Sequence, residues 1–134
     1  YCNAIERSRE HFDRASTVID AAFEHMENDE WDSCVTRLED APEEIVAAHE
    51  TGRDAFEMAE ADGPTEYETA AEEWLELITM TRRNAIELEA LCEAGVAGDE
   101  EEIRERRERI QLIGDELEEQ ERVVEEAFER IENG

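Results

Sequence analysis

The chain has 134 residues, of which 41 are acidic and 13 basic, and its formal net charge is −28. A surface this negative cannot gain counterion release from phosphates, which argues against nucleic acid and anionic lipid as partners. The length fits one domain over residues 1–134. No apolar run approaches the ~20 residues of a membrane span, so we expect no direct membrane insertion.

All of the basic residues are arginine, and lysine is absent. This composition resembles that of the acidic proteins of salt-in haloarchaea. In molar salt the Debye length is only ~3 Å, so the repulsion between carboxylates is screened. We therefore expect a halophilic, acidic protein.

Glycine, proline and acidic cap residues divide the chain into four segments of similar length. Good helix formers dominate each segment, and β-branched residues never alternate with period two, so we expect an all-α fold. In chain order we predict helices over about 3–27, 30–61, 65–96 and 99–132, with Asp29, Thr65 and Asp99 as N-caps.

A mostly apolar position recurs every seven residues in each predicted helix. If consecutive helices are antiparallel, these positions pair symmetrically around the three breaks. Trp31 then faces Gly95, and Trp74 faces Gly52, so the largest side chains meet the smallest. The sequence predicts an antiparallel up-down-up-down four-helix bundle with a heptad-type core, similar to a coiled coil.

Pro42 interrupts the second predicted helix. It has no N–H group to donate to the carbonyl of Leu38, so we expect a kink near Pro42. The register places Asn84 opposite. We predict that the Asn84 amide binds backbone groups freed by Pro42.

Core positions at the height of Pro42 and Asn84 are small or polar, which leaves two outcomes open. Either the helices approach closely, or a cavity opens in which Ser16, Thr81 and Asn84 form a small-ligand site.

His49 is a further candidate ligand-binding residue, with a half-exposed histidine as the alternative interpretation. It belongs to a second polar group with Ser8, Gln120 and Glu121.

Cys34 and Cys92 lie at one height on adjacent helices in this register. A disulfide between them would indicate an oxidising, extracytoplasmic compartment. Two buried thiols would indicate the cytoplasm, and the geometry of helix bundles favours this second outcome. Cys2 lies at the opposite end, which excludes a three-cysteine metal site.

Motifs of catalysis are missing from the sequence. None of the histidines follows a glutamate by three positions, as di-metal bundles require, and neither a G-x-S-x-G elbow nor a P-loop occurs. The stretch from Glu72 to Glu76 resembles the EExxE helix of MazG-like nucleotide pyrophosphohydrolases, although the ExxD that follows in that family is absent. The resemblance implies an acidic metal-dependent hydrolase. We expect no enzyme, and no metal or cofactor.

The last predicted helix repeats glutamate four residues before arginine, as in Glu102/Arg106 and Glu118/Arg122. This spacing predicts an exposed helix with weak surface ion pairs.

The sequence therefore predicts a non-enzymatic helical interaction or sensory module, as the soluble part of a larger or membrane-anchored chain. Its partner would be another protein or a second copy of itself. The alternative is a small-ligand-binding regulatory bundle with a mid-bundle pocket.

Overall fold

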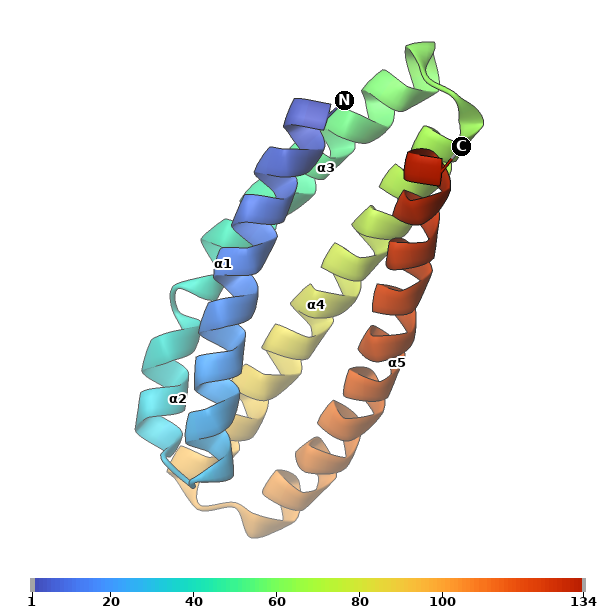
Figure 1. The fold of residues 1–134 in the computed structure, drawn as a ribbon. Helices are drawn as coiled ribbons and strands as arrows, with labels where there is room; N and C mark the ends of the chain where they lie inside the picture. Colours follow the sequence, from blue (N-terminus) through green and yellow to red (C-terminus); the bar gives the residue numbers. More distant parts are fainter. Residues whose placement is uncertain (1, 134) are drawn as a thin grey trace.

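The computed structural model describes residues 2–133, except for the side chains of Asp62 and Asn133. It contains five helices, α1 (Cys2–Glu27), α2 (Trp31–Leu38), α3 (Ala41–Asp62), α4 (Thr65–Ala97) and α5 (Glu100–Asn133) (Figure 1). No strand occurs among the described residues, and the all-α prediction is confirmed.

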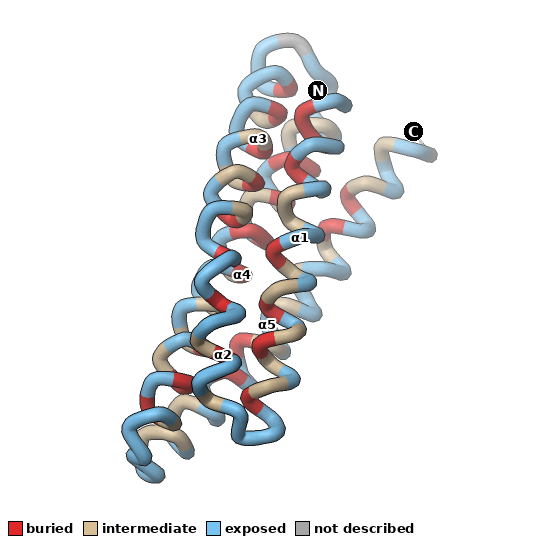
Figure 2. Tube along the Cα trace, turned by 90° about the vertical axis from the view of Figure 1, so that its left-hand side faces the viewer, coloured by how far each residue is buried: buried red, intermediate tan, exposed pale blue. Residues whose placement is uncertain are grey.

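The chain reverses direction after α1, after α3 and after α4 (Figure 1). Helices α2 and α3 follow one another in the same general direction. Helix α3 packs against α1 and α4, and α5 packs against α4. Buried residues form a stripe along the inner side of each long helix (Figure 2).

The segment predicted as one kinked helix over 30–61 consists of two helices. Glu39 and Asp40 separate the two helices. The N–H group of Glu39 donates to the Thr36 carbonyl at 3.3 Å, and that of Asp40 donates to the Arg37 carbonyl at 3.4 Å. Pro42 lies in the first turn of α3, where a missing N–H group costs no helical hydrogen bond. Pro42 therefore accompanies a helix break rather than a kink.

The helix ends follow the predicted capping in part. Asp99 caps α5, because its Oδ1 accepts the N–H of Glu102 at 3.2 Å. Gly98 ends α4 with a φ of 73°, which glycine adopts without strain. Asp29 does not cap α2 with its side chain, and Thr65 is itself the first residue of α4, after Pro64.

Both predicted tryptophan–glycine pairs are in contact. A Cβ atom on Gly95 would overlap the Trp31 ring, and a Cβ atom on Gly52 would lie 3.4 Å from the Trp74 ring. These two glycines leave the space in which the indoles lie.

Among the described residues, no helix has both the length and the apolar character needed to cross a bilayer.

Candidate functional site

One side of the molecule is open between α1 and α5. Among the described residues, Cα atoms of α5 come within 8 Å of no helix other than α4. Neighbouring helices in a closed bundle have axes 8–10 Å apart, so α1 and α5 are not packed as neighbours. Figures 1 and 2 both show the C-terminal end of α5 standing away from α1. We call the strip between residues 9–27 of α1 and 107–132 of α5 the α1–α5 seam.

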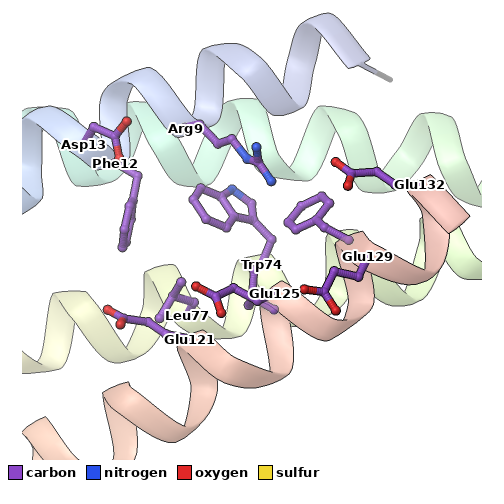
Figure 3. A pocket seen from close by; sticks show the side chains of 11 residues that line it. Arg9, Phe12, Asp13, Trp74, Leu77, Glu121, Glu125, Glu129 and Glu132 are labelled. Atoms are coloured by element: carbon purple, nitrogen blue, oxygen red, sulfur yellow. The ribbon is translucent and has the colours of Figure 1, made fainter.

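A cavity of about 430 Å³ occupies the seam near the N-terminal end of α1. Its apolar lining comes from three helices and consists of Phe12, Trp74, Leu77, Val124 and Phe128. Figure 3 shows the three aromatic rings side by side, with Trp74 in the middle. A second cavity of about 510 Å³ lies at the far end of the seam, beside Phe23 and Ile110. We call the first of these the aromatic cavity.

The rings of the aromatic cavity meet edge to face. The centroid of Trp74 lies 4.9 Å from that of Phe12 and 6.3 Å from that of Phe128, with interplanar angles of 60° and 69°. Aromatic rings prefer this arrangement, because the positive edge of one ring meets the negative face of the next.

Trp74 is fixed in place by a hydrogen-bonded chain. Its indole N–H donates to Ser8 Oγ at 2.6 Å, and the Ser8 hydroxyl donates to the Ala48 carbonyl at 2.7 Å. Gly52 permits this approach, since a Cβ atom there would lie 3.3 Å from Ser8 Oγ. The hydrogen bond to Ser8, together with the space that Gly52 leaves, therefore orients Trp74, the central ring of the cavity.

Arg9 extends from α1 across the cavity towards α5 (Figure 3). Its guanidinium carbon lies 4.3 Å from the centroid of the Phe128 ring, in a cation–π contact. Within the described part of the chain, no carboxylate forms an ion pair with Arg9. The side chain thus connects α1 and α5 through the face of an aromatic ring.

Carboxylates surround the aromatic cavity. They belong to Asp13, Glu121, Glu125, Glu129 and Glu132. Partial burial raises the pKa of Glu121 above the ordinary glutamate value, and repulsion by Glu125, Glu118 and Asp20 raises it further. The rim is therefore a place where a further negative charge is disfavoured and a positive charge is favoured.

Contacts with α4 hold α5 in place. Arg106 donates to Glu87 on α4 at 2.9 Å and to Glu102 on its own helix at 3.2 Å, and both carboxylates raise its pKa. Gln120 donates to the Glu73 carbonyl and carboxylate at 2.9 and 2.8 Å. The contacts with Glu87 and Glu73 join consecutive helices.

Arg107 crosses the open side at the far end of the seam. It pairs with Asp29 at 3.0 Å and lies 5.4 Å from the Trp31 ring. Arginine side chains therefore connect α5 to the opposite helices at both ends of the seam.

The mid-bundle residues predicted from the sequence do not line either seam cavity. Thr81 is buried, and its hydroxyl donates to the Leu77 carbonyl at 2.8 Å. Ser16 is half-buried. Asn84 is half-buried too, and its Oδ1 atom is buried without a hydrogen-bond partner. The prediction that Asn84 bonds to backbone near Pro42 is wrong, because no hydrogen bond of the Asn84 side chain occurs within the described residues, and Pro42 in the first turn of α3 costs no helical hydrogen bond.

His49 lines a different cavity, of about 310 Å³, between α3 and α4 with Ile78 and Arg82. The second predicted polar group is therefore dispersed. Ser8 orients Trp74, Gln120 binds Glu73, and Glu121 lies on the rim of the aromatic cavity.

Cys34 and Cys92 form a disulfide, with Cα atoms 6.2 Å apart. The sequence left both a bridge and two free thiols open and favoured the thiols. Gly95, one turn from Cys92, lets α2 and α4 approach closely beside Trp31.

The carboxylates of the EExxE stretch do not form a metal site. Glu73 accepts a hydrogen bond from Gln120, whereas Glu72 and Glu76 are exposed. In the described part of the chain, no group of three His, Cys, Asp or Glu side chains is placed to hold a metal ion.

Arg9 and Phe128 were not among the residues predicted from the sequence. Phe128 lies outside the seven-residue pattern, four residues after Val124, and Arg9 is one of several exposed arginines. The available signal was the spacing of Val124 and Phe128, which puts both on one face of α5.

Comparison with family models, curated proteins and solved structures finds no match to this chain.

Proposed function

We propose that the chain is a non-enzymatic helical binding module of the interaction or sensory type, and that the α1–α5 seam receives its ligand. One observation carries the proposal: within the described residues, the backbone of α5 comes close to that of α4 alone, and the side that it leaves open contains a cavity lined by three aromatic rings. Its volume of about 430 Å³ lies within the range of small-molecule sites.

We also propose that the helices form an incompletely closed up-down-up-down four-helix bundle, in which α2 and α3 together make the second member. The contact of Trp31 with Gly95 and the bridge between Cys34 and Cys92 support the heptad register of this arrangement. The fourth interface of a closed bundle, between its first and last members, would be the seam.

A fragment screen by NMR on isotope-labelled protein tests the site without assuming the ligand. We expect the amides most perturbed by weakly binding fragments to lie beside Phe12, Val124 and Phe128. Perturbations confined to the cavity at His49, or no binding at all, would contradict the proposal. Val124→Trp, which fills the aromatic cavity, should abolish the response.

A second candidate is a small-ligand site in the middle of the molecule. It is favoured by Asn84, because a buried carbonyl oxygen without a partner is rare in folded proteins. In the same screen, this site would be supported by perturbations at Ser16 and Thr81 that Asn84→Leu removes and Val124→Trp leaves intact.

The disulfide supports an oxidising, extracytoplasmic location for this module. Thiol counting under denaturing conditions tests it. We expect one reactive thiol, Cys2, before reduction and three after it. Three thiols in protein purified without reductant would contradict the bridge and favour the cytoplasm.

A further inference from the structure

The aromatic cavity combines features that together select for one kind of ligand. Phe12, Trp74 and Phe128 line the cavity from three helices, and carboxylates of α5 stand at the rim (Figure 3). Ring faces carry negative electrostatic potential, so the rings and the carboxylates attract the same sign of charge.

The chain already places a cation in this cavity. The Arg9 guanidinium lies 4.3 Å from the Phe128 centroid and, among the described residues, has no ion-pair partner. A positive charge is therefore accommodated here by the ring face and the surrounding field, without a direct salt bridge.

Hydration determines which cations can compete for such a site. Potassium and sodium ions keep their water shells and interact loosely with all of the exposed carboxylates of a chain of charge −28. An alkylated ammonium loses little hydration and buries its methyl groups against aromatic rings, as in the aromatic sites that bind quaternary ammonium compounds.

We propose that the aromatic cavity binds a small organic cation of the alkylated ammonium class, which displaces Arg9 from the Phe128 ring. The proposal rests on the α1–α5 seam being the binding site, and it names the ligand class of that site. Because Arg9 connects α1 to α5, its displacement would couple occupancy of the cavity to the position of α5.

Isothermal titration calorimetry with choline chloride tests the ligand class. The titration is run in ~2 M KCl, where non-specific attraction to the acidic surface is screened. The control ligand is 3,3-dimethylbutan-1-ol, which has the shape of choline but no charge. We expect choline to bind about tenfold more tightly than the alcohol, since desolvated cation–π contacts contribute about that factor.

Two matched pairs of variants locate the site. Phe128→Leu should weaken choline binding by about threefold to tenfold, because it removes a ring face but keeps apolar volume. Phe23→Leu, in the other seam cavity, should leave the binding unchanged. Arg9→Met should strengthen choline binding by a similar factor, whereas Arg7→Met removes the same charge from an exposed position of α1 and should not.

Circular dichroism verifies that each variant is folded. If Phe128→Leu fails to fold, the choline affinities of Arg9→Met and Arg7→Met still test whether the cation binds in the aromatic cavity. Equal binding of choline and the alcohol, or equal effects within each pair of variants, would overturn the cation proposal. If the cation proposal fails but neutral fragments still perturb the seam amides, the seam remains the proposed binding site. If neutral fragments do not perturb these amides either, the cation proposal and the proposed function are both wrong.

Discussion

Two helical glycines have opposite surroundings. A Cβ atom on Gly95 would overlap the Trp31 ring, whereas one on Gly114 meets nothing within 4 Å. We expect Gly95→Ala to lower the free energy of unfolding by about 1–3 kcal/mol, because the indole must move. Gly114→Ala should raise it by about 0.5–1 kcal/mol through the backbone entropy of glycine. Urea denaturation measures both, and changes of the same sign would contradict this packing.

The raised pKa of Glu121 fixes the sign of a pH effect. The Glu121 carboxyl binds its proton more tightly in the folded protein than in the unfolded chain. Protonation of Glu121 therefore stabilises the fold. This stabilisation is complete at a pH below the pKa of the unfolded chain, and it is lost as the pH rises through the pKa of the folded protein. Glu121→Gln should therefore raise Tm near neutral pH, and this gain should shrink below pH ~4, where the wild-type carboxyl is protonated. Glu116→Gln, exposed on the same helix, controls for net charge. Equal gains in Tm for Glu121→Gln and Glu116→Gln at every pH would contradict an effect specific to the surroundings of Glu121.

At the scale of the helices, the backbone of α5 packs against α4 alone within the described residues, while Arg9 and Arg107 reach across the open side. We expect the amides of α5 to exchange hydrogen faster than those of α4, because α4 packs against several helices and local opening follows low contact density. Arg106→Gln should speed exchange in α5 further, since Arg106 joins it to Glu87. Arg109→Gln, at an exposed position, should not. Hydrogen exchange with mass spectrometry gives both comparisons, and equal protection of α4 and α5 would contradict the open seam.

The sequence predicts contacts between consecutive helices better than it predicts the seam. Short connections and side-chain volume constrain a hairpin, so Trp31 could be paired with Gly95 from spacing alone. No turn joins α1 to α5, so the heptad pattern did not reveal that these helices are apart. The contact of Arg9 with Phe128 depends on the distance between α1 and α5, and no sequence feature near either residue indicates it.

The helix break shows a second limit of sequence interpretation. Proline predicts an interruption, but a kink at Pro42 and a break before it look alike in sequence. The structure has the break at Glu39 and Asp40 and places Pro42 in the first turn of α3, where its missing N–H group leaves no helical hydrogen bond for Asn84 to replace.

At the scale of the whole molecule, charge dominates. With a net charge of −28, self-repulsion in dilute buffer is large against a folding free energy of about 5–15 kcal/mol. We expect Tm to be higher at ~2 M than at ~0.1 M KCl, because salt screens the carboxylates. Melting followed by circular dichroism tests this, and an unchanged Tm would contradict both the repulsion and the halophilic character.

The bridge between Cys34 and Cys92 also limits how far the chain can be stretched. The two cysteines are separated by 58 positions, and the segment between them cannot lengthen while the bridge is intact. At ~3.3–3.6 Å per residue, the fully unfolded oxidised chain should be about 200 Å shorter between its ends than the reduced one. Optical tweezers with and without reductant would measure this difference. Under tension, the force would pass through α1 and α5, the two helices that border the seam, while the closed loop from α2 to α4 adds no length.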